Sequence, residues 1–105
     1  IDGTTANYGR VRGKAFVTMD AREAAKIEKG QILITSMTSP DFIAGIKKAE
    51  GIVTNEGGVT CHAAIIAREF NVPCVVGTKI ATKVFQNGDV IEVDGNHGKV
   101  RKIST

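Results

Sequence analysis

The sequence predicts an α/β fold that ends in an antiparallel hairpin, and three observations support this. Short apolar runs of strand type alternate with segments of helical composition, glycines separate most of them, and two strand-like runs around a glycine-bounded turn close the chain. Such alternation is typical of a sheet covered by helices. The 105 residues match the usual size of one domain, so we expect a single domain over residues 1–105.

The expected strands are short runs rich in valine, isoleucine and threonine. Residues 52–54 and 74–76 are of the type that is buried on both faces. Residues 89–94 alternate with period two and lead into the turn of the closing hairpin, which is residues 95–98. The full set of expected strands is residues 13–19, 31–36, 52–54, 74–76, 89–94 and 99–103.

Three helices are expected between these strands. Asp20 can cap the start of the first. Ser39-Pro40-Asp41 combines a cap residue, a proline at the first helical position and an acid in the first turn, so a second helix starts there. The expected helical ranges are residues 21–28, about 40–49 and about 61–70.

Composition excludes several classes of function. The net charge is +3, but the basic residues are scattered, without the concentrated stripe of a nucleic-acid-binding surface. No apolar run approaches the length of a membrane span. Cys61 and Cys74 are too few for a disulfide framework or a zinc site, and such cysteine usage fits a reducing cytoplasm. We therefore expect no nucleic-acid partner and no membrane partner.

One segment concentrates the chemistry, because a Gly57-Gly58 turn leads from a strand directly into a helix with His62 in its first turn. The start of a helix presents unpaired N–H groups and the positive end of the macrodipole, and it binds phosphate readily. A second positive charge is disfavoured there, which favours the neutral imidazole that can attack phosphorus. Glycines let the backbone approach a ligand closely. The segment predicts a nucleophile, His62, with Gly57, Gly58, Thr60 and Cys61 around its phosphoryl group.

Each of these residues also has a simpler interpretation. A lone histidine near a helix start is commonly a surface residue or a hydrogen-bonded core residue. Thr60 can be an N-cap with no chemical role. Cys61 can be a small packing residue, although a helix start also favours a thiolate. From the residues alone, His62 is a candidate nucleophile.

Three other residues have chemical side chains but no expected chemical role. Cys74, in an apolar strand, is expected in the core. Arg68 lies six residues past His62, about 240° around the helix, so it faces elsewhere and is expected only to oppose the helix dipole. His97, in a polar turn, is expected to be exposed and inert.

Residues 57–69, continued by residues 71–78, resemble the signature of the mobile phosphohistidine domain of phosphoenolpyruvate-utilising enzymes. That family includes phosphoenolpyruvate synthase, pyruvate phosphate dikinase and rifampicin phosphotransferase, and the cysteine before the histidine is most similar to the synthase version. Residues 30–35, 38–41 and 87–95 also resemble the family. The similarity covers nearly all of residues 9–103.

The resemblance implies a swivelling β/β/α fold and a phosphoryl carrier. His62 would accept a phosphoryl group at an ATP-grasp nucleotide-binding domain and deliver it to a phosphoenolpyruvate/pyruvate-binding domain. Mg²⁺ and ATP are implied for the parent enzyme, and no cofactor or metal for this domain. The position of Thr60 matches a regulatory phosphorylation site of the synthase and dikinase.

The chain has no P-loop and no room for those partner domains. We therefore expect it to be one domain of a longer multidomain phosphotransferase, and its first residue, Ile1, favours this. A hairpin so near the end resembles the rifampicin phosphotransferase type, in which the swivelling domain comes last, and a free-standing phosphocarrier is the other alternative. Two further hypotheses are a non-catalytic regulatory module and a redox or metal protein that uses Cys61, His62 and Cys74.

Overall fold

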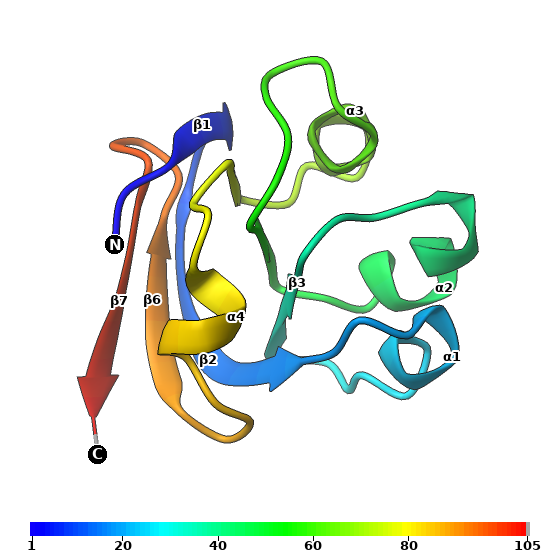
Figure 1. The fold of residues 1–105 in the computed structure, drawn as a ribbon, viewed down its shortest axis with the longest axis horizontal. Coiled ribbons are helices and arrows are strands. Elements are labelled where there is room, and N and C mark those ends of the chain that lie inside the picture. Colours follow the sequence, from blue (N-terminus) through cyan, green and yellow to red (C-terminus); the bar gives the residue numbers. More distant parts are fainter. Residues whose placement is uncertain (105) are drawn as a thin grey trace.

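Seven strands form one curled sheet, around which the helices are arranged (Figure 1). The structure is a computed structural model, and it describes residues 1–104. From one edge to the other the strand order is β1-β5-β4-β3-β2-β6-β7. The four central strands are parallel, and β1, β6 and β7 are antiparallel to their neighbours. The strands are β1 (Thr4–Asn7), β2 (Arg10–Val17), β3 (Gln31–Thr35), β4 (Gly51–Thr54), β5 (Cys74–Val76), β6 (Val90–Asp94) and β7 (Lys99–Ser104).

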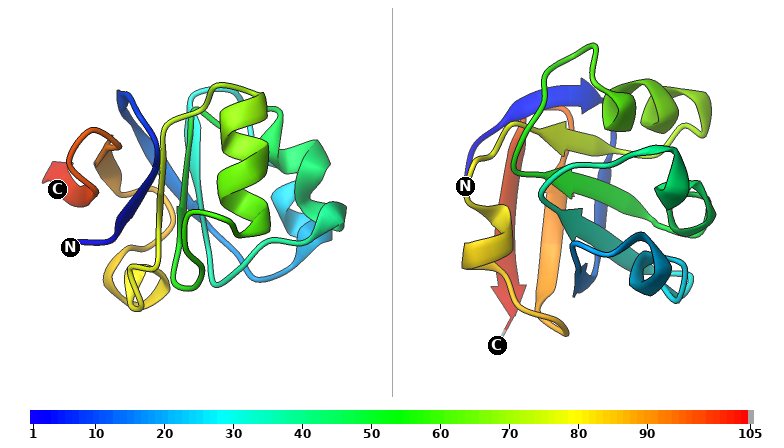
Figure 2. Two further views of the ribbon diagram at one scale, coloured as in Figure 1. Left: turned by 90° about the horizontal axis from the view of Figure 1, so that it is seen from above. Right: turned by 45° about the vertical axis from the view of Figure 1, so that its right-hand side comes forward.

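The first residues of the chain bring the two edges of this sheet together. Asp2 forms an isolated antiparallel bridge with Lys99, and the N–H of Val100 donates to the carbonyl of Ile1 at 2.9 Å. Gly3 donates to the carbonyl of Gly98 at 2.8 Å. The segment that leads into β1 therefore lies against β7, and the sheet curls back on itself (Figure 2).

Helices cover both faces of the sheet, so its central strands are buried on both sides. The helices α1 (Ala21–Ala24), α2 (Ile43–Ile46) and α3 (His62–Glu69) lie on one face, and α4 (Ala81–Val84) lies on the other (Figures 1 and 2). Strand β3 shows the alternation that follows from its pleat. Its Leu33 joins the core beneath α1–α3, whereas Ile32 and Ile34 join the second core, which includes Ala81 of α4. All three are fully buried.

The predicted fold class is confirmed, and so is the closing hairpin of β6 and β7. All six expected strands are present, with the first shifted: β2 covers Arg10–Val17 rather than residues 13–19. Strand β1 and helix α4 were not predicted. Both are only four residues long, and the N-cap residue of α4, Ile80, makes no side-chain cap bond. The first N–H groups of α4 donate instead to the side chains of Thr78 and Asn55.

Two of the predicted helices are shorter than expected. Asp20 does cap α1, through a 2.8 Å bond from the N–H of Arg22, but α1 ends at Ala24, not at residue 28. The next turns have i→i+3 bonds and carry the buried Ile27 into the core. The helix expected over about 40–49 is divided into a short 3₁₀ helix, η1 (Pro40–Phe42), and α2, and Ser39 makes no side-chain cap bond. Tertiary packing overrides helix propensity at both places.

The approach of α2 to α1 explains part of this shortening. A Cβ built on Gly45 would lie 2.5 Å from the carbonyl oxygen of Ala24, so the two backbones are in contact. Only glycine permits such an approach. None of the helices in residues 1–104 is long and apolar enough to cross a membrane.

Lys79, just before α4, has a left-handed backbone conformation with φ = 73°. This conformation costs an L-residue about 1–2 kcal/mol, whereas glycine adopts it freely but loses about 0.5–1 kcal/mol of chain entropy. We therefore expect Lys79→Gly to raise the free energy of unfolding by about 0.5–1 kcal/mol, measured by denaturant titration. Lys83→Gly, inside α4, is the matched control and should lower the free energy of unfolding. A lower stability for Lys79→Gly would contradict the prediction.

Candidate functional site

The candidate site lies at the edge of the sheet where the parallel strands end. The register pairs Thr35 with Thr54, so β3 and β4 end side by side and their following loops are neighbours. The loop after β4 leads into α3, whose first residue is His62. In open α/β sheets, ligands bind at this carboxyl edge of the strands.

His62 is held by a residue of the neighbouring loop. The Oγ1 of Thr38 lies 2.9 Å from the Nδ1 of His62, within hydrogen-bonding distance. Both residues are half-buried. Within residues 1–104 the Nε2 of His62 has no hydrogen-bond partner from the protein. The contact therefore fixes the ring through one nitrogen and leaves the other nitrogen available.

A hollow of about 320 Å³ lies in front of this histidine. Three of the residues predicted for the site, Gly57, Cys61 and His62, line it together. Gly58 and Thr60 belong to the same loop, but they are not among the lining residues. The full lining is Met37, Thr38, Thr54, Glu56, Gly57, Cys61, His62 and Ala63.

The start of α3 confirms the expected position of His62 and corrects one detail. The N-cap is Cys61, not Thr60, and it makes no side-chain cap bond. Thr60 is exposed instead. Since no side chain caps this end, the first N–H groups of α3 are free to bind an anion.

The two glycines of the loop differ in what they permit. Gly57 has φ = 102°, and a Cβ there would lie 2.7 Å from the Sγ of Cys61. Glycine is required at this position by both the backbone conformation and the contact. Gly58 has open space around its Cα, so it leaves room for a ligand.

Buried threonines at the strand ends hold the loop that carries these glycines. Thr54 donates to the carbonyl of Glu56 at 2.6 Å, and Thr78 donates to the carbonyl of Thr54 at 2.9 Å. The Oγ of Ser36 donates to the Oε2 of Glu56 at 2.9 Å, which links the loops after β3 and β4. The bonds of the two buried threonines rigidify the site, whereas the bond of Ser36 to Glu56 is exposed.

Arg68 has more contacts than its position on α3 suggested. Its Nε donates to the carbonyl of Ala6 at 2.9 Å, and its Nη2 donates to the carbonyl of Val59 in the loop that leads into α3. The prediction that Arg68 only opposes the helix dipole is therefore wrong. His97 is exposed as expected, with its Nδ1 at 2.9 Å from the Oδ2 of Asp94.

Cys74 is fully buried in β5, as predicted, and both cysteines are free thiols. Burial raises the pKa of the Cys74 thiol to about 12. In the part of the chain that the structure describes, no three His, Cys, Asp or Glu side chains are grouped to hold a metal ion. The structure therefore gives no support to a metal site made of Cys61, His62 and Cys74.

The raised pKa of Cys74 predicts a loss of stability in alkali. Because the thiol ionises more easily in the unfolded chain, its contribution is fully present below about pH 9 and is lost as the pH rises toward 12. Between about pH 8 and about pH 10.5 we expect the wild type to lose about 2 kcal/mol more than Cys74→Ala. Denaturant titration of both proteins at the two pH values checks this. Equal losses in the two proteins would contradict it.

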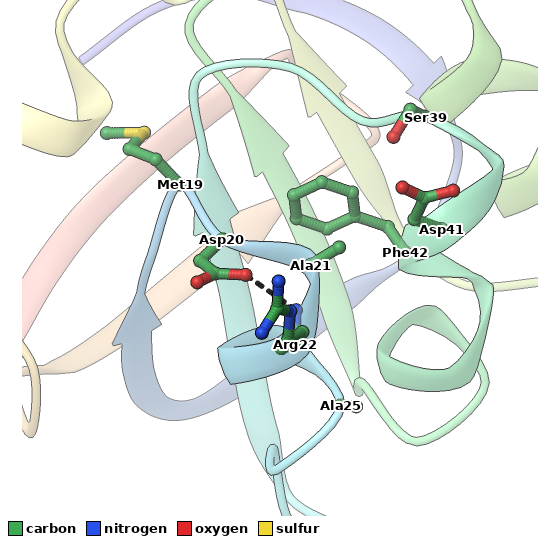
Figure 3. A pocket seen from close by; sticks show the side chains of 8 residues that line it. All are labelled: Met19, Asp20, Ala21, Arg22, Ala25, Ser39, Asp41 and Phe42. Atoms are coloured by element: carbon green, nitrogen blue, oxygen red, sulfur yellow. Dashed lines mark hydrogen bonds between the residues drawn. The ribbon is translucent and has the colours of Figure 1, made fainter.

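A second hollow, of about 740 Å³, lies between α1 and η1 (Figure 3). Its polar side chains include Asp20, Arg22 and Asp41, and Asp20 is already bonded to the N–H of Arg22. This hollow contains no histidine or cysteine. The smaller hollow beside His62 is therefore the better candidate for covalent chemistry.

Two contributors to the site, Thr38 and Arg68, were missed as functional residues. Thr38 entered the sequence analysis only within residues 38–41, and its position beside His62 depends on the pairing of β3 with β4, for which the sequence carries no local signal. Arg68 was placed by helical angle relative to His62, which ignores that a long side chain points back toward the start of its helix.

The curled sheet and the start of α3 define a small α/β domain with a histidine at the carboxyl edge of its parallel strands. Residues 27–98 match the family model described as "PEP-utilising enzyme, mobile domain". The chain belongs to this family, the mobile domains of phosphoenolpyruvate-utilising enzymes.

Individual relatives agree with this assignment. The chain is 51% identical over 100 residues to a probable phosphoenolpyruvate synthase of Archaeoglobus fulgidus. This match covers 95% of the chain and 13% of the relative. It is 48% identical over 102 residues to the phosphoenolpyruvate synthase of Pyrococcus furiosus, with 97% of this chain and 12% of the relative covered. The chain thus spans only about an eighth of these relatives.

Among solved structures, the chain is similar to Enzyme I (nEIt), determined in solution by NMR. The TM-score is 0.67 at 31% sequence identity, and the match covers 78% of this chain and 34% of that one.

Proposed function

We propose that this chain is a phosphoryl carrier in which His62 is transiently phosphorylated. The observation that carries the proposal is the 2.9 Å contact between the Oγ1 of Thr38 and the Nδ1 of His62. A hydroxyl that accepts from Nδ1–H fixes the tautomer whose lone pair is on Nε2. Nε2 is then the nitrogen that is phosphorylated.

The step is a direct transfer between phosphorus and nitrogen. The lone pair of Nε2 attacks the phosphorus of the donor, the N–P bond forms, and the P–O bond to the leaving group breaks. The proton on Nδ1 stays in its bond to Thr38, which stabilises the positive charge on the ring. The reverse sequence returns the phosphoryl group to an acceptor oxygen.

The start of α3 would bind the phosphoryl oxygens. The free N–H groups of its first turn suit an anion. Gly57 and Cys61 line the hollow beside His62, and Gly58 and Thr60 belong to the same loop. Among its described residues the chain has no cluster of three or more His, Cys, Asp or Glu side chains that could hold a metal ion. We assign the Mg²⁺ and ATP of the parent reaction to another domain.

As a carrier, this domain would be part of a longer multidomain enzyme of the phosphoenolpyruvate synthase type. Its partners would be an ATP-grasp nucleotide-binding domain and a phosphoenolpyruvate/pyruvate-binding domain, in the same or a separate chain. The small share of each relative that the chain covers supports this. Two free thiols suit the cytoplasm, where ATP and phosphoenolpyruvate would meet the carrier.

Thr60 is a candidate for regulatory phosphorylation within the same site. It is exposed and stands two residues before His62, and its side chain does not cap α3. A phosphate on Thr60 would place negative charge near the first turn of α3 and repel the phosphoryl donor.

The function is tested by phosphorylating the chain from phosphoenolpyruvate in the presence of a separately made barrel domain of a synthase. Intact-mass spectrometry with and without acid treatment should show one acid-labile phosphoryl group per chain. If no adduct forms with the barrel domain and phosphoenolpyruvate, and none forms with an ATP-grasp domain and ATP, the carrier function is wrong. Phosphorylation from ATP alone would instead favour a rifampicin phosphotransferase-like enzyme or a free-standing carrier with another acceptor.

A further inference from the structure

Arg68 joins two parts of the chain that are far apart in sequence. Its Nε donates to the carbonyl of Ala6 in β1, and its Nη2 donates to the carbonyl of Val59, three residues before His62. Ala6 is buried in the core beneath α3. One guanidinium therefore connects the edge strand of the sheet to the loop of residues 57–60, here called the glycine loop.

The chemistry of the contact requires arginine. A guanidinium presents several N–H donors in one rigid plane, so it can bind two carbonyls in fixed directions. A lysine at the same place has one flexible ammonium group and cannot hold both carbonyls in the same way. Hydrogen bonds from a charged donor are also stronger than those between neutral groups.

The glycine loop needs such an external contact. Two of its residues are glycines, which lose the most conformational entropy on ordering. Its other two residues, Val59 and Thr60, are exposed and have little packing to hold them. Inside the loop segment, the N–H of Cys61 donates to the carbonyl of Gly58 at 3.1 Å. The hydrogen bond from Arg68 to the carbonyl of Val59 holds the middle of the glycine loop in place.

The chain contains a natural comparison for Arg68. Asn7 also connects β1 to α3, since its Nδ2 donates to the carbonyls of Ala67 at 3.3 Å and of Val72 at 3.0 Å. Both side chains join the same strand to the same helix. Only Arg68 reaches the glycine loop.

We propose that Arg68 is a positioning residue for phosphoryl transfer, which holds the glycine loop so that the first turn of α3 and His62 stay open to the phosphoryl group. This inference rests on the carrier function proposed above. Arg68 does not contact His62, and it acts through the backbone of Val59. The role differs from opposing the helix dipole, because it depends on two directed hydrogen bonds rather than on charge alone.

The experiment compares Arg68→Met, Arg68→Lys and Asn7→Ala in this chain. The first readout is hydrogen exchange of the amides of residues 58–63, which needs no partner domain. The second is the rate of His62 phosphorylation from phosphoenolpyruvate with the synthase barrel domain. Denaturant titration of each variant shows how much of any change comes from general destabilisation.

We expect Arg68→Met to speed exchange in the glycine loop about tenfold or more and to slow phosphorylation by a similar factor. Arg68→Lys keeps the charge, but it should restore neither the slow exchange nor the phosphorylation rate of the wild type fully. Asn7→Ala should lower stability without either effect. If Arg68→Met matches Asn7→Ala in both readouts, or if Arg68→Lys restores both, the positioning role is wrong. Should the wild type fail to become phosphorylated, the carrier function fails, and the exchange data alone then decide whether Arg68 holds the loop.

Discussion

Replacing His62 with alanine is expected to abolish the acid-labile phosphoryl group. His62 lines the hollow at the start of α3, and its Nε2 has no hydrogen-bond partner within the described residues. Its loss removes the proposed nucleophile itself. Transfer through the chain should fall at least about 10⁴-fold, as it does when a covalent nucleophile is removed. Rapid-quench labelling with radioactive phosphoenolpyruvate measures the remaining rate.

The other histidine of the chain is the matched control. His97 is exposed, in the turn between β6 and β7, and its ring contacts Asp94. His97→Ala should be phosphorylated at the wild-type rate. His62→Ala should remain folded, with a change in stability of at most about 1 kcal/mol, because it loses one half-buried hydrogen bond. A phosphoryl group that survives in His62→Ala would assign the chemistry to another residue.

The position of His62 could be predicted from sequence because it depends on local structure. A buried strand, two glycines and a helix follow one another within residues 51–69, and the observed β4 and α3 match that reading. The histidine is the first residue of α3. Nothing distant in the chain is needed to place it there.

The partner of the histidine could not be predicted in the same way. Thr38 and His62 are 24 residues apart, and they meet because β3 and β4 are parallel neighbours in a particular register. Pattern alone predicted both strands but not their pairing. The contact between Arg68 and Ala6, which are 62 residues apart, was still less predictable, because strand β1 itself was not predicted.

The shortened helices have a related cause. Asp20 and Pro40 mark helix starts correctly because caps are local signals. The helix ends depend on packing: Ile27 turns into the core, and Gly45 lies against the backbone of α1. Such contacts are set by the whole fold. The helix predicted from the composition of residues 21–28 is therefore longer than the observed α1.

Removing the hydroxyl of Thr38 is expected to slow phosphorylation of His62 without unfolding the chain. Thr38→Val keeps the branched shape of the side chain but loses the 2.9 Å contact to Nδ1. The imidazole is then free to change its tautomer and to rotate, so the lone pair is less often on Nε2 and aimed at phosphorus. Loss of the group that orients a metal-bound histidine typically costs about 10- to 100-fold in activity, and we expect a change of this order here. Single-turnover labelling from phosphoenolpyruvate measures the change.

Two further variants separate orientation of the ring from disturbance of the loop. Thr38→Ser retains a hydroxyl and should recover most of the rate, while Ser39→Ala alters the next residue, whose side chain makes no cap bond, and should have no effect. Nitrogen NMR of the imidazole gives a direct readout, because the Nδ1–H form should dominate in the wild type and in Thr38→Ser but not in Thr38→Val. If Thr38→Val transfers as fast as Ser39→Ala, the hydroxyl does not orient the nucleophile, and the choice of Nε2 as the phosphorylated nitrogen loses its structural basis.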